Sequence, residues 1–230
     1  MDNQLNDRSV RGQILTRRDI EQLALSAAPS HLVDCELEEV DLSGLSLPLW
    51  TFERCNLRHA DFTGSTLDGT SWLSCRGAFA ILTGADLSDA RLVASDFNNC
   101  VLRRAVLSGT TFERCKLTGS DLSHAKTLDL TFDETILINA KLPRFSFHKQ
   151  ILHKLDFSHA DLSECDFRGA VFVGCSLKDA SMNGSRFENA DLRGADLGGL
   201  RLVDAALFRG AIIAHEQAEQ LLNELGLQVR

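Results

Sequence analysis

The chain has 230 residues, of which 44% are hydrophobic, and its formal net charge is −8. This length suffices for one sizeable core, while no run approaches the about 18 apolar residues that span a bilayer. The polar start, MDNQLNDRSVRGQIL, is unlike a signal peptide, and the acidic balance disfavours general binding to nucleic acid or anionic membranes. We therefore expect a cytoplasmic protein that contacts neither a membrane nor nucleic acid directly.

Residues 16–27, TRRDIEQLALSA, are predicted to form a helix within an N-terminal segment, 1–29. Thr16 can cap this helix, and Asp19 lies near its N-terminal turn. Four apolar residues share one of its faces, namely Ile20, Leu23, Ala24 and Ala27. Because the helix precedes a long repeat, we expect it to act as a lid over the first repeating layer.

Residues 30–213 repeat every five positions. Counted from Leu32 to Ile212, 35 of 37 steps hold a large apolar residue, and only Gly77 and Thr127 do not. We call these large apolar residues the apolar centres of the repeat. The residue two positions before each centre is small, the one just before it is often Asp, and the one two positions after it is often Gly. The unit therefore reads A-D-L-x-G. A helix has a period near 3.6 and a strand a period of 2, so neither alone explains this pattern.

A compound unit does explain a period of five. Three residues alternate in, out and in, as in a short strand, and two turn a corner, where Gly tolerates positive φ. Burying one Leu or Phe stabilises by about 1.5–3 kcal/mol, whereas ordering five residues costs about 1.5 kcal/mol each. One unit cannot fold alone, so the units must stack and cover one another.

Four segments carry a family resemblance: ADFTG (60–64), ADLSD (85–89), ADLSE (160–164) and ADLRG (190–194). They resemble the pentapeptide-repeat family, and the resemblance extends over about 30–212. It implies an all-β fold, namely a right-handed quadrilateral β-helix with four repeats per coil. We expect short α-helices at its N- and C-terminal ends.

All seven cysteines occupy the small inward position: Cys35, Cys55, Cys75, Cys100, Cys115, Cys165 and Cys175. These cysteines could form a metal or redox site or serve as small buried residues. The regular placement favours burial, and the absence of a CxxC motif argues against disulfides in a cytosolic chain. We expect no cofactor and no metal.

Residues 45–51 depart from the pattern. Leu45 and Trp50 are too large for the small position, and Pro48 cannot donate a backbone hydrogen bond to a ladder. We expect a distorted corner or a small loop here.

Residues 141–155, KLPRFSFHKQILHKL, depart further. Three successive small positions hold Phe145, Gln150 and Leu155, and the segment is basic without any acid. Two interpretations stay open, a wider coil with a solvated face or a projecting basic loop that binds a partner. The candidate partner-binding residues are Arg144, His148, Lys149, His153 and Lys154. His148 and His153 lack a third ligand, which argues against a metal pair.

A second set of candidates is acidic. With four repeats per coil, Asp41, Asp61, Asp121 and Asp161 share one face. They are candidate partner-binding residues, and the alternative is that they form hydrogen bonds at the corners. Residues 30–212 hold 25 acids and 19 Lys or Arg, a net of −6, so any mimicry of DNA must reside on one face.

Residues 215–225, HEQAEQLLNEL, are predicted to form a second helix that Gly226 stops. The segment 214–230 resembles the C-terminal end of the Qnr and MfpA group of pentapeptide proteins, which implies a two-fold homodimer. Capping within one chain is the alternative. Candidate dimerisation residues are Leu221, Leu222, Leu225 and Leu227.

The sequence contains no Gly-rich phosphate loop, G-x-S-x-G motif or H-E-x-x-H motif. We therefore expect no enzyme. The resemblance implies a DNA mimic that binds a protein partner, DNA gyrase or topoisomerase IV, and modulates quinolone susceptibility. The alternative is a protein-interaction scaffold or effector with a different protein partner, because a fold alone does not fix a function.

Overall fold

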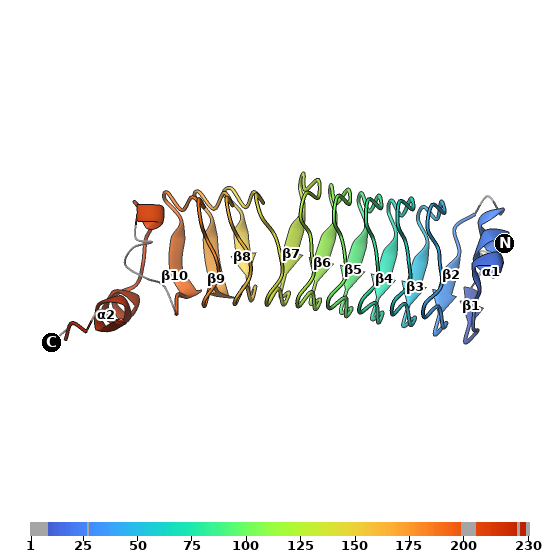
Figure 1. The fold of residues 1–230 in the computed structure, drawn as a ribbon, viewed down its shortest axis with the longest axis horizontal. Helices are drawn as coiled ribbons and strands as arrows, with labels where there is room; N and C mark the ends of the chain where they lie inside the picture. The colour runs from blue at the N-terminus through green and yellow to red at the C-terminus, as the bar shows by residue number, and fades with distance from the viewer. Residues whose placement is uncertain (1–8, 27, 199–205, 225, 229–230) are drawn as a thin grey trace, which may run out of the picture. The chain divides into compact units, whose positions relative to one another are not determined.

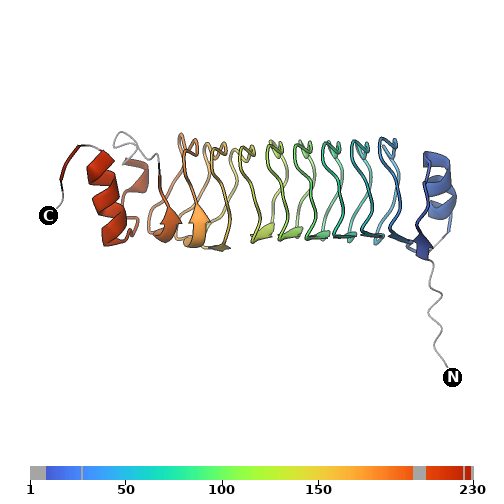
Figure 2. The same ribbon diagram turned by 90° about the horizontal axis from the view of Figure 1, so that it is seen from below.

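The computed structural model describes residues 9–26, 28–198, 206–224 and 226–228. The chain divides into two compact units, residues 1–131 and 132–230. Each unit is a stack of coils in which short strands line up along one side (Figures 1 and 2).

The N-terminal unit contains one helix and a ladder of parallel strands. From β2 onward each strand pairs with the strand of the next coil, as in His31 with Thr51. Its elements are β1 (Ser9–Arg11), α1 (Arg17–Ala24), β2 (His31–Val33), β3 (Thr51–Glu53), β4 (Ser71–Leu73), β5 (Arg91–Val93) and β6 (Thr111–Glu113).

The C-terminal unit follows the same plan, and its first strand begins one residue before the boundary. Its strands also pair in parallel, as in Ile151 with Val171. The elements are β7 (Thr131–Asp133), β8 (Ile151–His153), β9 (Val171–Ser176), β10 (Asp191–Asp196) and α2 (His215–Glu224).

Every coil has four sides, which we number faces 1 to 4. Face 1 carries the strands, and faces 2, 3 and 4 carry the single parallel bridges that begin at Glu36, Asp41 and Ser46 in the first complete coil. These bridges join equivalent positions of adjacent coils, as Asp41 with Asp61, so one coil contains four of the pentapeptide units. The predicted all-β fold, a right-handed quadrilateral β-helix with short terminal helices, is confirmed.

The apolar centres fill the interior of each unit. Phe52, Phe62 and Trp72 are fully buried, and the Phe52 and Trp72 rings stack with centroids 4.3 Å apart. The exception at Gly77 has a steric cause, because a Cβ there would lie 2.2 Å from Cε1 of Phe97. The large ring of the next coil thus occupies the space that Gly77 leaves.

The corners use positive φ more widely than the glycine pattern predicts. In the described part of the chain, 23 non-glycine residues have φ between 46° and 66°, a region that side chains with a Cβ seldom adopt. The N–H of such a residue donates to a carbonyl of the next coil, as Glu39 does to Arg58 at 2.9 Å and His59 to Ala78 at 3.1 Å. These hydrogen bonds offset the cost of the corner conformation.

Residues 45–51 form a regular corner, so the expected distortion or loop is wrong. Leu47 and Leu49 donate to Thr66 and Asp68 of the next coil, both at 2.8 Å. Pro48 is tolerated because its position does not contribute an N–H to the ladder. At the equivalent position of the preceding pentapeptide, the Ser43 N–H donates to Asp41 Oδ1, two residues earlier, at 2.9 Å and not to the next coil.

Helix α1 is shorter than predicted but covers the coil as expected. Thr16 caps it in a capping box with Asp19, Ile20 is fully buried, and Arg17 donates to Asp41 of the first coil. Ala27 lies outside the described residues. The sequence did not predict β1, which pairs with β2 and extends the sheet ahead of the repeats.

Helix α2 matches its predicted range, and its end is a glycine cap. Gly226 has a φ of 78°, and the Leu227 N–H donates back to the Leu222 carbonyl at 3.0 Å. The division into segments 1–29, 30–213 and 214–230 stays a prediction.

Candidate functional site

The basic segment 141–155 is an in-register coil of the repeat, so the interpretation as a projecting loop is wrong. Lys141 and Ser146 form parallel bridges with the next coil. Phe145 and Leu155 are buried, at 4% and 1% exposure, and the half-exposed Gln150 completes the set of bulky corners. Phe145 and Leu155 therefore pack inside the coil, and the backbone keeps its register.

The five basic candidates in this coil point to three different faces. Arg144 lies at the corner after face 3. His148 lies on face 4 with Lys149 at the corner after it, and His153 lies on face 1 with Lys154 at the corner after it. The structure therefore does not bring them together into one basic patch.

Three of these side chains pair with acids of the adjacent coils. Arg144 pairs with Glu164 at 3.0 Å, Lys154 with Glu134 at 2.7 Å, and His153 with Asp133 at 2.8 Å. The hydrogen bond from Arg144 lowers the pKa of Glu164, and that to Glu134 raises the pKa of Lys154. Each partner lies one coil away, so the charges form ladders along the coils. A role of the five basic candidates in binding a partner stays a prediction.

The acidic candidates share face 3 without forming one continuous column. Asp41 bridges to Asp61, but Ile81 and Val101 occupy the next two coils before Asp121. Asp161 occupies the same face of the C-terminal unit.

Each of the four carboxylates accepts the N–H two residues further along. The distances are 2.8–3.0 Å for Asp41, Asp61, Asp121 and Asp161. Asp41 also pairs with Arg17 at 3.1 Å, and its hydrogen bonds with Ser43 lower its pKa. The structure thus shows the corner hydrogen bonds of the alternative interpretation, while a role in binding stays a prediction.

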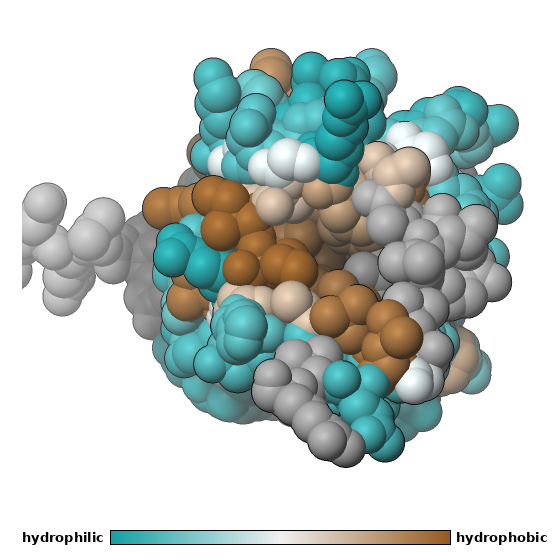
Figure 3. Space-filling view, turned by 90° about the vertical axis from the view of Figure 1, so that its left-hand side faces the viewer, coloured by the Kyte–Doolittle hydropathy of each residue, from teal (hydrophilic) through white to brown (hydrophobic). Residues whose placement is uncertain are grey.

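The C-terminal end exposes a hydrophobic surface (Figure 3). Leu222 and Leu227 are 38% and 54% exposed, and Ile212 and Ile213 add 50% and 37%. Leu221 is half-buried, and Leu225 lies outside the described residues. The two isoleucines were missed as surface residues, because the five-residue count places Ile212 in the core.

Helix α2 is attached to the last described coil through Gln217. Its Nε2 donates to the carbonyls of Leu192 at 2.7 Å and Ala195 at 2.6 Å, and its Oε1 accepts from the Ala214 N–H at 2.6 Å. These bonds satisfy open carbonyls of the coil and hold the helix against it. The helix therefore caps the unit and also presents the apolar surface.

The cysteines are buried and are not joined in disulfides, as expected. Five of them occupy the corner that follows face 1, namely Cys35, Cys55, Cys75, Cys115 and Cys175. On faces 2 to 4 the carbonyl of an apolar centre accepts the N–H three residues on, as Leu57 does from Ala60 at 3.1 Å.

After face 1 a thiol or hydroxyl of the next coil takes that role. Cys75 donates to Phe52 at 3.2 Å, and Ser95 to Trp72 at 3.1 Å. Sequence reasoning treated this position as merely small, but Cys or Ser fills it at 35, 55, 75, 95, 115 and 175, which signals a donor, whereas Thr135, Leu155 and Ala195 interrupt the series. Burial raises the pKa of Cys100 to about 12, so this thiol stays protonated at neutral pH.

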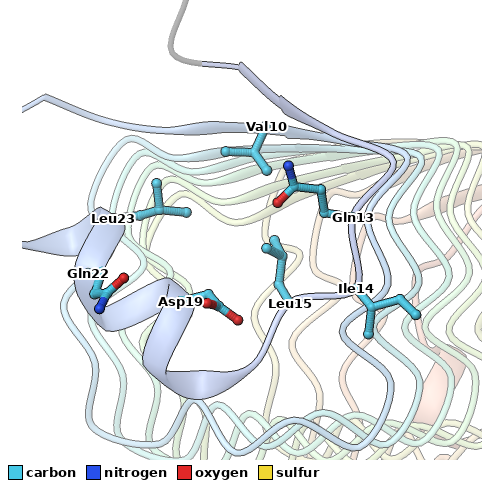
Figure 4. Close-up of a pocket in the computed structure, with 7 residues that line it drawn as sticks. All are labelled: Val10, Gln13, Ile14, Leu15, Asp19, Gln22 and Leu23. Carbon is cyan, nitrogen blue, oxygen red and sulfur yellow. The ribbon is translucent and has the colours of Figure 1, made fainter.

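A cavity of about 300 Å³ lies at the N-terminal end, between α1 and the turn after β1 (Figure 4). Val10, Leu15 and Leu23 give it apolar walls. Asp19 is its one carboxylate and already accepts from Thr16 N and Oγ1, at 2.8 and 2.6 Å. The cavity therefore presents no pair of nucleophile and base.

Among the residues that the structure describes, no group of three His, Cys, Asp or Glu side chains is placed to hold a metal ion. Nor does any described helix combine the length and apolar character needed to cross a membrane.

Matches to models of known protein families show to which family the chain belongs. Models of pentapeptide repeats match residues 35–71, 55–98, 85–124 and 132–169, and a second model of such repeats matches 156–212. The chain belongs to the pentapeptide-repeat family. No curated protein sequence matches this pentapeptide-repeat protein.

Solved structures of the family share its fold. QnrB1, described as a plasmid-mediated fluoroquinolone resistance protein, is 18% identical with a TM-score of 0.58, over 96% of this chain and 97% of its own. HetL, a pentapeptide-repeat protein involved in heterocyst differentiation regulation in the cyanobacterium Nostoc, is 23% identical with a TM-score of 0.55, over 83% and 87%.

Proposed function

We propose that this pentapeptide-repeat protein is a non-enzymatic DNA mimic that binds a type II topoisomerase, DNA gyrase or topoisomerase IV, and so modulates quinolone susceptibility. The observation that carries the proposal is the likeness to the fluoroquinolone resistance protein QnrB1 over nearly the whole of both chains. The filled interior of each unit supports an interaction role, because it leaves outer faces rather than a deep cleft for a partner.

Charge restricts where such mimicry can lie. Duplex DNA carries one negative charge per about 1.7 Å, whereas residues 30–212 have a net charge of only −6. Face 1 contributes little net negative charge, because Asp34 and Glu113 form ion pairs with arginines there. The mimicry is therefore assigned to carboxylates at the corners of face 3, such as Asp61.

The test is DNA supercoiling by purified gyrase in the presence of ciprofloxacin, with and without this protein, and the same assay with topoisomerase IV. We expect the protein to shift the ciprofloxacin concentration that inhibits supercoiling, or to inhibit supercoiling itself. Unchanged drug sensitivity together with no detectable binding to either enzyme would reject the proposal.

We further propose that the protein acts as a homodimer through its C-terminal end. The support is the exposed apolar surface of Ile212, Leu222 and Leu227, because exposed apolar patches mark sites of association. Sedimentation of the wild type should report a dimer, and the double variant L222D/L227D should be a monomer. L25D is the matched control, since Leu25 is 87% exposed in the other unit. A monomeric wild type, or a double variant that stays dimeric, would contradict this assignment.

A second candidate function is a scaffold or effector for a different protein. The likeness to HetL, which is named for a role in differentiation, supports it. The paired charges on face 1 support it as well, because ladders of both signs do not resemble a DNA backbone. This candidate predicts that the gyrase and topoisomerase IV assays are both negative, so the same experiment separates the two functions.

A further inference from the structure

A second cavity, of about 280 Å³, lies in the N-terminal unit beside the corner at residues 45–51. Pro29 comes from the connection after α1, while Pro48, Leu49 and Trp50 come from the corner itself. Trp50 is only 3% exposed and forms the floor, and Leu49 is 60% exposed at the rim. The residues that broke the repeat pattern therefore build an apolar pocket.

The corner is constructed so that Leu49 stays on the surface. Leu49 has a φ of 62°, and its side chain lies above Gly69 of the next coil, where an added Cβ would be 2.6 Å from Cδ2 of Leu49. Because Gly69 has no Cβ, Leu49 can lie flat along face 4. The rim of the pocket thus continues directly to Asp68, whose carbonyl accepts the Leu49 N–H at 2.8 Å.

Face 4 beyond the pocket is acidic and lacks neutralising cations. Asp68 lies on the next coil, and Asp86 and Asp89 on the one after. The stretches SLPL, TLDG, DLSD and VLSG, which form this face at 46–49, 66–69, 86–89 and 106–109, contain no Lys, Arg or His. Within the part of the chain that the structure describes, no ion pair involves any of these three carboxylates, in contrast to the paired acids of face 1.

We propose that face 4 of the N-terminal unit, from the Leu49 pocket to Asp89, binds an extended basic segment of another protein. One apolar side chain of that segment enters the pocket, which is smaller than a typical small-molecule site and suits a single Leu or Phe. Lys or Arg residues that follow it pair with the carboxylates. Charge complementarity selects this occupant, because three carboxylates without an ion-pair partner beside an apolar pocket favour a cationic partner. Asp86 Oδ1 accepts from Ser88 N and Oγ, at 3.0 and 2.6 Å, which leaves its negative charge without a counter-ion.

The spacing of the coils defines the motif. Adjacent coils lie about 4.8 Å apart, and an extended chain advances about 3.3 Å per residue. Asp68 and the pair Asp86 and Asp89 are therefore reached by cations two to four positions after the apolar residue. This surface is separate from face 3 and from the C-terminal end, so the inference stands whether or not the topoisomerase proposal does.

The experiment titrates the full-length protein, labelled with ¹⁵N, with the peptide GSFSKRKSG. The two indole N–H signals serve as reporters. Trp50 forms the pocket floor, whereas Trp72 is fully buried and donates to Thr70 Oγ1 at 2.9 Å. We expect the Trp50 signal to shift in a saturable way while the Trp72 signal stays in place. Control peptides are GSSSKRKSG, which lacks the anchor, and GSFSEEESG, which reverses the charge.

Variants locate the site. The isosteric triple variant D68N/D86N/D89N and the single variant L49S should each weaken binding by about tenfold or more, and added salt should weaken wild-type binding. D96N, on face 2 of the same unit, is the control and should bind as wild type does. No saturable Trp50 shift, equal binding of the control peptides, or unchanged affinity in the triple variant would overturn the proposal.

Discussion

The enclosed apolar column can be tested at Phe62 and its neighbour Thr63. Phe62 is fully buried, and its ring meets Trp72 edge-on with centroids 5.3 Å apart and Phe52 at 6.4 Å. Truncating a buried Phe to Ala costs about 3–5 kcal/mol, a large part of the about 5–15 kcal/mol that stabilises a typical domain. Phe62→Leu keeps most of the volume but loses the ring contacts, which are worth about 0.5–1.5 kcal/mol each.

The matched substitution, Thr63→Ala, changes an exposed residue. The hydrogen bond from Thr63 to Asp61 is donated by the backbone N–H, so the variant keeps it. We therefore expect the free energy of unfolding to change by no more than about 0.5 kcal/mol. Urea unfolding followed by circular dichroism gives the free energy of unfolding for all three variants. The expected order of loss is Phe62→Ala, then Phe62→Leu, then Thr63→Ala. Equal losses at the two positions, or a larger loss at Thr63, would refute the register.

Three further predictions concern single positions. Gly77→Ala should destabilise strongly although it adds only one methyl group at an inward position, because the new Cβ collides with the Phe97 ring; thermal unfolding with no loss would contradict this. Cys75→Ala should be less stable than Cys75→Ser by about 1 kcal/mol, since serine keeps a donor for the carbonyl of the preceding coil, and the reverse order would show that the thiol only fills space. The hydrogen bond from Arg168 holds the pKa of Asp166 at about 2, below its ordinary value near 3.9, so this pair stabilises above about pH 4 and is lost toward pH 2. Wild type should therefore lose more stability than Asp166→Asn on acidification, and parallel losses would refute the coupling.

The period of five was sufficient to predict the apolar core, the family resemblance implied the four-sided coil, and local signals predicted both helices. Each apolar centre, such as Phe62, had to face inward because no other arrangement buries one side chain in five. Thr16 and Asp19 likewise marked the start of α1 by local chemistry alone. These features depend on neighbours in the sequence, and they were predicted correctly.

Features that depend on the next coil were harder to predict. Pro48 looked disruptive because the sequence does not show that its position donates no ladder hydrogen bond. Arg144 and Lys154 looked like one basic patch, since their acidic partners lie one coil away on different faces. The pocket at Trp50 could not be seen either, because it requires Pro29 to come beside a corner that is distant in the sequence.

The measurement that tests the account most directly is the reactivity of the native thiols. All seven cysteines are buried at the inward corner position, and burial raises the pKa of Cys115 to about 11 and of Cys165 to about 12. Mass spectrometry after brief treatment with N-ethylmaleimide should find no adduct on the folded protein and seven on the protein unfolded in urea. A cysteine that reacts rapidly in the folded protein would place that side chain on the outside and contradict the inward register of the coils.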